Sequence, residues 1–334
     1  MKYPDKKIMI VSLQYDYGQR SRGIASEKIW FHDTFQRLVG RVEAFWYDDF
    51  IKDARPLQSQ LLEAADKLKP DLIFFLPYTD QFDIETLEQL KKKYVTVCWF
   101  GDDQWRFPYY TKRLAPHFSR VITTDPMRIP DYRDLGLEPI LSDWAGERRD
   151  AVIGGLDTVD HQYDVSFIGG RNDVRSWFIR RLEQRGINVH CFGAGWPAGR
   201  LDFEQMKAVF LRSRINLNLS NSVPKDVSFI FSRPRNFARW LISKKQTEQV
   251  KARNFEIPLA GGFQLSQYAV GLERHWEIGR EIAIYNTPDE CASQIYYYLS
   301  NAKERDRMTA AAHERAVREH TFDVRLSNIL SEIF

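Results

Sequence analysis

The sequence predicts an α/β fold with two Rossmann-like parallel-sheet domains that face each other across a cleft. Two observations predict it: apolar, strand-like runs alternate with amphipathic helical stretches, and the alternation restarts after a polar interval. The length of 334 residues supports two domains, because single cores stop growing at about 250 to 300 residues. We expect domains at 1–150 and 151–310, then C-terminal helices at 311–334, the last of which can cross back to the first domain.

In the first half, each strand-like run is short and almost wholly apolar. "DLIFFLP" is typical, and such runs suit a sheet that is covered on both faces. Between them, apolar residues recur three and four positions apart, as in helices with one buried face. The predicted strands are 7–14, 42–49, 71–77, 95–101 and 120–125, and the predicted helices are 25–39, 57–69 and 84–93.

The polar interval is "AGERRDAVIGGLDTVDHQ" at 145–162, which we interpret as the linker between the domains. Beyond it, glycines directly follow two strand-like runs. Ligands of open parallel sheets bind at the carboxyl ends of the strands, where these glycines lie. The predicted strands, some with their loops, are 163–170, 187–197, 215–220, 261–266 and 281–286, and the predicted helices are 173–186, 202–214, 288–300, 303–319 and 323–334.

Composition argues against several function classes. The net charge of +3 gives no whole-protein field that would recruit nucleic acid. Cys98, Cys191 and Cys291 lack metal-ligand spacing and lie in apolar segments, as expected of reduced thiols in a cytoplasmic protein. No apolar stretch approaches the roughly 18 residues of a membrane-spanning helix.

One glycine turn opens a helix in the second half. Gly169, Gly170 and Arg171 follow the strand "YDVSFI" and precede that helix. Free N–H groups and the positive end of the helix dipole could bind a phosphate there, with Arg171 and Arg175 adding charge. A plain tight turn explains the glycines equally well.

Two further strand ends carry candidate ligand-binding residues. At Gly193, Gly195 and Trp196, the backbone could pass close to a flat base, or the tryptophan could simply pack. Asn218 and Ser220 could donate hydrogen bonds to a sugar, or they could satisfy the local backbone.

The stretch "ARNFEIPLAGGFQLS" places an arginine and a glutamate three residues apart, so a helix would bring them to one face. An arginine suits a diphosphate, and a carboxylate is the natural acceptor for the two hydroxyls of a ribose. The glycine pair would permit close backbone approach. The predicted nucleotide-diphosphate cradle is Arg253, Glu256, Gly261, Gly262 and Phe263, and the alternative is an Arg–Glu surface pair ahead of a turn.

The stretch 225–253 is strongly basic and interleaves aromatic residues. Its many Lys and Arg residues stand against only Asp226 and Glu248. Such a composition on a short helix suits an anionic membrane surface, or an acidic or lipid-linked acceptor. The alternative is a solvated helix that packs through its aromatic face. Single-stranded nucleic acid could use a similar patch, but nothing else in the chain supports it, so we expect no nucleic-acid partner.

Several pieces of the second half resemble the C-terminal domain of the CgeB-like (spore maturation protein) glycosyltransferases, a GT-B group related to glycosyl transferase group 1. They are "YDVSFIGGRNDVR", "CFGAGWP", "INLNLSNS", "KARNFEIPLAGGFQL", "EIAIYNTPDECASQIYYYL" and "REHTFDVRL", in order over residues 163 to 326. "SLQYDYGQRSRGIASEK" and "CWFGDDQW" are similar to N-terminal pieces of the family, more loosely. The resemblance implies the GT-B fold, an acceptor side on the first domain, a nucleotide-sugar donor held mainly by the second, and neither a cofactor nor an obligatory metal.

The resemblance also bears on two glutamates. Glu256 matches the family's "FE" position, similar to the glutamate that group 1 enzymes use on the donor ribose. Glu248 and Glu256 have the E-x7-E spacing of group 1 retaining enzymes. Because the neighbours of Glu248 lack the apolar and glycine residues of that motif, we interpret the spacing as accidental and read no stereochemical outcome from it.

Sugar transfer needs a stabilised leaving diphosphate and an activated acceptor hydroxyl. Arginines and helix N-termini can do the first without a metal. Asp102 or Asp103, directly after a predicted strand, is the candidate base of an inverting enzyme, and a helix N-cap or turn aspartate is the alternative. A DxD metal signature is absent, because the carboxylates of "YDD" and "GDD" are adjacent.

The loop after the first strand is the candidate acceptor or phosphate side. It carries Tyr17, Gly18, Arg20 and Arg22. These side chains could meet the acceptor or a phosphate, and a mobile solvated loop is the alternative.

We therefore expect a metal-independent glycosyltransferase that moves a hexosyl or related sugar to a glycan, lipid-linked or protein acceptor in surface polysaccharide or glycoconjugate assembly. The expected location is cytoplasmic, with peripheral contact at the inner membrane face through 225–253 as one option. Two alternatives stay open: a nucleotide-sugar 2-epimerase on the same scaffold, and a non-catalytic sugar-nucleotide or glycan-binding protein.

Overall fold

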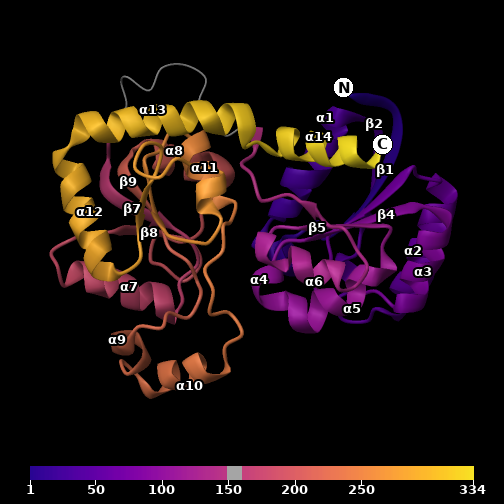
Figure 1. Cartoon of the computed structure of the whole chain (residues 1–334), viewed down its shortest axis with the longest axis horizontal. Coiled ribbons are helices and arrows are strands. Elements are labelled where there is room, and N and C mark those ends of the chain that lie inside the picture. Colours follow the sequence, from indigo (N-terminus) through magenta and orange to yellow (C-terminus); the bar gives the residue numbers. More distant parts are fainter. Residues whose placement is uncertain (149–159) are drawn as a thin grey trace. The chain divides into compact units, whose positions relative to one another are not determined.

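A computed structural model describes residues 1–148 and 160–334 of the chain. They divide into two compact units, each with its own parallel sheet (Figure 1). The first unit contains Met1–Trp144 and Phe322–Phe334, and the second contains Ala145–Thr321. Most of the predicted linker at 145–162 lies outside the described residues.

The unit limits differ from the boundaries expected at residues 150 and 310. The second unit continues to Thr321, because helix α13, Ala302–Glu319, packs on helix α11, Arg253–Leu259, of the same unit. The final helix α14, Phe322–Ile333, groups instead with the first unit.

The sheet of the first unit is parallel throughout, with the strand order β2-β1-β3-β4-β5-β6. The order reverses between β1 and β3, which makes this a doubly wound sheet. The strands are β1 Tyr3–Ser12, β2 Val39–Trp46, β3 Leu72–Phe75, β4 Val95–Phe100, β5 Arg120–Thr123 and β6 Ile140–Leu141. The remaining helices of this unit are α1 Asp33–Leu38, α2 Arg55–Leu68, α3 Ile84–Lys93, α4 Asp103–Arg106, α5 Lys112–Leu114 and α6 Ile129–Arg133.

Alternate residues of β3 show how both faces of this sheet are covered. Ile73 and Phe75 join the core cluster that includes residues of α2 and α3. Phe74 points to the opposite face, where its ring centroid lies 5.8 Å from that of Phe31 and 5.1 Å from that of Phe35. The continuous apolar strand is therefore buried on both sides, as its sequence predicts.

Helix α14 completes that second face. The Phe322 ring stacks on Trp30 with a centroid distance of 5.4 Å and lies 5.3 Å from Phe31. Arg37 of α1 donates two hydrogen bonds to Asp323, at 3.0 and 2.8 Å. The last residues of the chain are thus part of the first core.

The second unit has the strand order β11-β10-β9-β7-β8, again parallel throughout. Helices α7 and α12 share the core cluster on one face, and α8 and α11 share the cluster on the other. The strands are β7 Tyr163–Ile168, β8 His190–Phe192, β9 Ser213–Asn218, β10 Gln264–Gln267 and β11 Ala283–Tyr285. Its other helices are α7 Asp173–Glu183, α8 Phe203–Leu211, α9 Val227–Ile230, α10 Pro234–Ile242 and α12 Pro288–Ser300.

The predicted elements match the observed ones best where hydrophobic period and caps agree. Helix α3 has its predicted bounds, and α12 begins at Pro288 after the cap Thr287, whose side chain accepts from the Glu290 N–H. The prediction is weakest between residues 25 and 39, where a π-helical turn at Lys28–His32 precedes the short helix α1. None of the described helices is long and apolar enough to cross a membrane.

Candidate functional site

The strand order of the second unit fixes where a ligand would bind. The chain passes from β7 to β8 on one side and then to β9 on the other, so the topological switch point lies between β7 and β9. Open parallel sheets bind ligands at such a point, outside the carboxyl ends of the strands. The predicted residues at 169–171, 193–196 and 218–220 all lie at or just beyond these strand ends.

The glycine turn after β7 is tied to the loop after β8. The Gly169 N–H donates to Phe192 O and the Arg171 N–H to Ala194 O, both at 2.8 Å. Asn172 caps α7, and its Oδ1 accepts the Arg175 N–H at 2.9 Å. The N–H groups of residues 169 and 171 are therefore already used and are not available to a phosphate.

Gly193 is required by the close approach of the two loops. Its φ is +123°, and a Cβ there would lie 2.5 Å from Gly169 O. Trp196 locks the same contact, because its indole Nε1–H donates to Gly169 O at 2.8 Å. These observations support the packing alternative for Trp196, with Arg171 lying over its ring at 5.3 Å. Gly195, at φ +85°, is part of the same turn.

Arg175 lies beneath this turn, where the sequence predicts that it adds positive charge. Its guanidinium donates to Gly170 O at 2.9 Å and to Leu219 O at 3.1 Å, while Nε is buried without a partner. Within the described residues its contacts include no carboxylate. Burial, and then the charge of Arg253, lower the pKa of Arg175 to about 10. The positive charge of Arg253 thus disfavours the charged form of Arg175, and an anionic ligand at the switch point would offset this repulsion.

Arg253 and Glu256 form the predicted one-turn pair on α11. Arg253 Nη1 lies 2.6 Å from Glu256 Oε2. The glutamate side chain is only 6% exposed, and burial raises its pKa. The surface-pair alternative is therefore wrong: the pair lies against the core, where the arginine covers the Phe210 ring at 5.2 Å.

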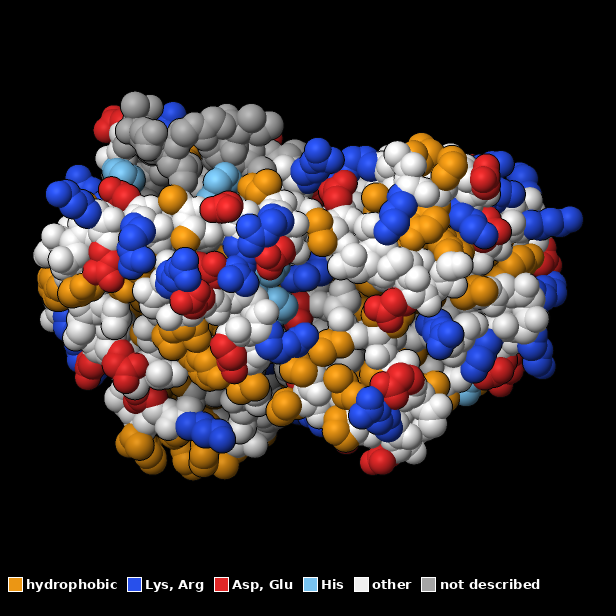
Figure 2. Space-filling view, turned by 45° about the horizontal axis from the view of Figure 1, so that its top comes forward, with side chains coloured by type: hydrophobic (Ala, Val, Ile, Leu, Met, Phe, Trp, Pro, Cys, Tyr) orange, Lys and Arg blue, Asp and Glu red, His pale blue; other side chains and the backbone are white. Residues whose placement is uncertain are grey.

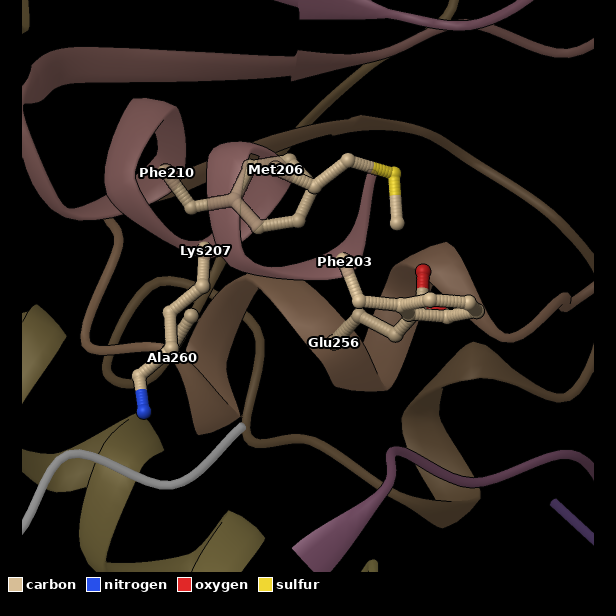
Figure 3. A pocket seen from close by; sticks show the side chains of 6 residues that line it. All are labelled: Phe203, Met206, Lys207, Phe210, Glu256 and Ala260. Carbon is tan, nitrogen blue, oxygen red and sulfur yellow. The ribbon is translucent and has the colours of Figure 1, made fainter. Parts of the chain in front are cut away.

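Glu256 also lines a small pocket between α8 and α11 (Figure 3). The free space in it is about that of one water molecule. In the close-up, the Lys207 amino group points away from Glu256, which lies beside the ring of Phe203. A ribose could meet this carboxylate only if side chains of α8 shifted. The pocket is lined by Phe203, Met206, Lys207, Phe210, Glu256 and Ala260.

Three residues of the predicted cradle are interior. Gly261, Gly262 and Phe263 are all buried, and the Phe263 ring packs on Tyr298 with a centroid distance of 4.7 Å. A Cβ on Gly262 would lie 2.6 Å from the side chain of Asn216. These residues position α11 against β10, so direct ligand contact is not the role that this packing supports.

Polar side chains at the ends of β9 and β10 largely bond to one another. Asn218 Nδ2 donates to Ser266 Oγ at 3.2 Å, and the Ser220 N–H donates to Gln267 Oε1 at 3.2 Å. Ser220 Oγ accepts the Ser222 N–H at 3.1 Å, so the local-backbone alternative holds for Ser220, whereas the Asn218 side chain bonds to a side chain of β10 and not to local backbone. Gln267 Nε2 in turn donates to Glu248 Oε1 at 3.1 Å.

Glu248 is a residue that the sequence interpretation set aside. Burial raises its pKa, and among the described residues its Oε2 is buried without a partner. The neighbouring Gln249 has both side-chain amide atoms buried without partners. Glu248 thus lies near the end of β10 and Glu256 lies between α8 and α11, and the interpretation of the E-x7-E spacing as accidental stays a prediction.

Asp103, in the first unit, is fully buried. Its carboxylate accepts hydrogen bonds from Thr111 and Thr123 at 2.6 Å and from Tyr132 at 2.7 Å. Burial raises its pKa to about 6. Because an acceptor hydroxyl has no route to this carboxylate, the geometry does not suit Asp103 as the general base.

Asp102 is the partly exposed member of the pair. It precedes α4, and its backbone carbonyl accepts the N–H groups of Trp105 and Arg106 at 3.2 and 3.0 Å. Its side chain does not cap the helix. The N-cap alternative therefore does not account for this carboxylate, and Asp102 stays the candidate base.

The loop after β1 is folded back on the first unit. Asp48 accepts the Gln14 and Tyr15 N–H groups at 2.8 and 2.9 Å, which holds the start of the loop. Tyr17 has a left-handed backbone, φ +53°, and is half exposed, with Arg22 over its ring at 4.3 Å. These contacts argue against the mobile-loop alternative.

Two further residues of the loop complete this candidate surface. Gly18, at φ +68°, leaves no room for a side chain, since its Cβ would lie 2.0 Å from Ile51 Cδ1. Arg20 lies over the Tyr15 ring at 5.5 Å. Tyr17 reaches the loop after β3, where its ring meets Tyr78 edge-on at 5.6 Å.

Among the described residues, no group of three or more His, Cys, Asp or Glu side chains could hold a metal ion. Metal independence stays a prediction of the sequence.

The chain is similar to known proteins in part of its sequence and in its structure. Residues 171–331 match the model of a family described as glycosyl transferase-like. No curated protein matches the sequence. The HepE protein of Anabaena, solved with UDP and glucose, is similar in structure at 12% identity and TM-score 0.66, over 98% of this chain and 99% of that one.

Two other solved proteins are similar over nearly their whole length. Sucrose-phosphate synthase from Thermosynechococcus elongatus has 10% identity and TM-score 0.67, over 98% of this chain and 99% of that one. A glycosyltransferase from Rickettsia africae has 10% identity and TM-score 0.59, over 99% and 97%. The predicted fold is thereby confirmed: the chain has two parallel-sheet α/β domains of the glycosyltransferase GT-B type. The CgeB-like resemblance stays a prediction.

Proposed function

We propose that the chain is a glycosyltransferase that holds a nucleotide-diphosphate sugar on its second unit and transfers the sugar without a metal. The acceptor is a glycan, a lipid-linked sugar or a protein in surface polysaccharide or glycoconjugate assembly on the cytoplasmic side. The observation that carries the proposal is that Arg175, at the switch point of the second sheet, is held by two backbone carbonyls and contacts no carboxylate among the described residues.

The two arginines would neutralise the diphosphate. As the bond to the sugar breaks, negative charge grows on the leaving phosphate oxygens, and fixed cations in a poorly solvated site stabilise it without reorganising. Arg175 is held in place by two backbone carbonyls, so its position is set before the ligand arrives. Arg253 bonds to Glu256, and a bound nucleotide would compete for both partners.

The two glutamates would orient the rest of the donor. Glu256 is the proposed acceptor for the ribose hydroxyls, in line with the glutamate implied by the family resemblance. The buried, unpartnered Oε2 of Glu248 supports a second carboxylate contact on the donor. If the reaction inverts, Asp102 is the proposed base that takes the proton of the acceptor hydroxyl.

A thermal-shift screen against UDP, GDP, TDP, CMP and their sugars tests donor binding. A ligand at about 100 times its dissociation constant stabilises the folded state by about 2.7 kcal/mol, which raises the melting temperature by about 4 °C in a chain of this size. We expect one nucleotide diphosphate to do so, and Glu256→Ala to lose the shift.

The matched control is Glu277→Ala. Glu277 forms an ion pair of the same i,i+3 kind with Arg280 at 3.0 Å, in the same unit but exposed. It should keep the full shift. No shift from any nucleotide would refute the donor site. A transferase should bind the nucleotide sugar and release free nucleotide only when an acceptor is added. An epimerase or a binding protein should show no such acceptor-dependent release.

A further inference from the structure

The segment between β9 and α11 forms a small helical insertion on the second unit. We call residues 225–245 the α9–α10 segment; Figure 1 shows its two helices at the lower end of this unit. The Val223 N–H donates to Lys245 O at 2.8 Å and closes its base. Phe229 is fully buried against Trp177, with ring centroids 5.4 Å apart. The insertion is therefore anchored to the core.

Helix α10 presents its apolar face outward. Asn236 is buried and Trp240 packs on the core, so one helix face is accounted for. The side chains of Leu241 and Ile242 point away from this face and are 60% and 80% exposed. Ordinary surface helices bury their apolar stripe, so this arrangement is inverted. The expected alternative, packing through the aromatic residues, holds for Phe229 and Trp240 but not for Phe231 and Phe237, which are 72% and 41% exposed.

The outward side chains continue beyond α10. Phe231 is 72% exposed, and its ring lies 5.9 Å from that of Phe237 in a stacked contact. Figure 2 shows hydrophobic side chains gathered at this lower end of the unit. Contiguous exposed apolar surface of this kind marks an interaction site. The exposed apolar side chains are Val227, Phe231, Phe237, Leu241 and Ile242.

The same segment is the most basic part of the chain. Residues 225–245 carry a net charge of +5, so the rest of the chain, against +3 overall, carries −2. Arg235 and Arg239 share Asp173 as an ion-pair partner and still leave the surface cationic. Two copies of this surface would repel each other, which disfavours a symmetric dimer through it. The basic side chains are Lys225, Arg233, Arg235, Arg239, Lys244 and Lys245.

We propose that the α9–α10 segment docks on an anionic lipid membrane. Its apolar tip would enter the boundary between headgroups and acyl chains, and the surrounding cations would lie among the lipid phosphates. An inverted amphipathic helix with a basic rim has the composition that this interface selects. The proposal concerns this surface alone and holds whether or not the chain transfers a sugar.

Co-sedimentation with vesicles, without any nucleotide, tests the proposal. The full chain is mixed with vesicles of phosphatidylcholine alone or with about one third phosphatidylglycerol, at two salt concentrations. We expect binding to the anionic vesicles only, weakened by salt. Arg233→Glu with Lys244→Glu should lower the partition coefficient at least 25-fold, at about fivefold for each cation lost.

Leu241→Ser with Ile242→Ser should abolish binding while the fold is kept, because neither side chain is buried. The matched controls are Val270→Ser with Val317→Ser for exposed apolar residues, and Lys303→Glu with Arg307→Glu for exposed cations of the same unit. These should bind as wild type does. No binding to anionic vesicles, or equal loss in the controls, would overturn the proposal. So would self-association in ultracentrifugation that only the Leu241–Ile242 variant abolishes.

Discussion

Replacing Arg175 by methionine should separate stability from ligand binding. The substitution keeps most of the side-chain length and removes the charge. The lowered pKa, about 10, means that the fold holds this guanidinium at a cost of about 3 kcal/mol at neutral pH. The sign follows from linkage: a base whose pKa falls on folding destabilises the fold at every pH below its folded pKa.

The loss of two hydrogen bonds would offset the stability gained by removing this buried charge. Arg175 donates to Gly170 O and Leu219 O, and each such bond from a charged donor contributes about 1.5 to 3 kcal/mol. The two effects largely offset each other, so the free energy of unfolding should fall by no more than about 3 kcal/mol. In the Arg175→Met variant, a bound diphosphate would lose a charge-assisted contact that contributes about 1.5 to 3 kcal/mol. Its affinity should therefore fall by about 10- to 150-fold.

Urea-induced unfolding measures the first quantity, and calorimetric titration with UDP and GDP measures the second. Arg180→Met, on the same helix α7, is the control and should leave affinity unchanged. If Arg175→Met lost several kcal/mol of stability and kept full affinity for the nucleotide, Arg175 would be a structural residue and the reasoning would be refuted.

Three further predictions concern other residues. Asp103→Asn should remove a pH dependence: the raised pKa of Asp103 gives the wild type stability below about pH 4, and about 3 kcal/mol of it is lost as pH rises through 6. Urea titrations of both proteins between pH 4 and 7.5 check this, and parallel curves would contradict it. Asp102→Ala should lower turnover by about 100-fold or more and leave donor affinity intact; unchanged nucleotide release in an acceptor-dependent assay would exclude Asp102 as the base. Gly193→Ala should cost at least about 2 kcal/mol, because its Cβ would meet a backbone oxygen, whereas Gly199→Ala, also at positive φ but in open space, should cost about 1 kcal/mol; equal melting temperatures would rule out the steric argument.

The sequence could predict the sheets because each strand carries its own signal. After Asp71, "LIFF" is apolar at every inward and outward position, as expected of a strand in a sheet that is covered on both faces. The one-turn spacing of Arg253 and Glu256 was equally local, and the helix that joins them is the observed one.

Burial of individual polar groups could not be predicted in the same way. Asp102 and Asp103 are adjacent in sequence, yet only Asp103 turns inward, toward hydroxyls from Thr111, Thr123 and Tyr132. That difference depends on contacts between residues up to 29 positions apart.

The exposure of the apolar face of α10 could not be predicted from the sequence, for a related reason. An amphipathic pattern specifies two faces, but only tertiary packing decides which of them meets the core. In the α9–α10 segment, Phe229 and Trp240 supply the anchor, and the remaining apolar residues are left outside.

The return of α14 to the first unit has a consequence for synthesis on the ribosome. Phe322 covers Trp30 and Phe31, so one face of the first sheet stays partly uncovered until the residues of α14 leave the ribosome. The second unit is complete in sequence before that moment and behaves as an insertion into an unfinished domain. A nascent chain that has emerged only as far as Thr321 would carry an exposed aromatic surface, open to chaperones and to misassembly. Premature termination near the C-terminus would therefore damage the domain encoded first.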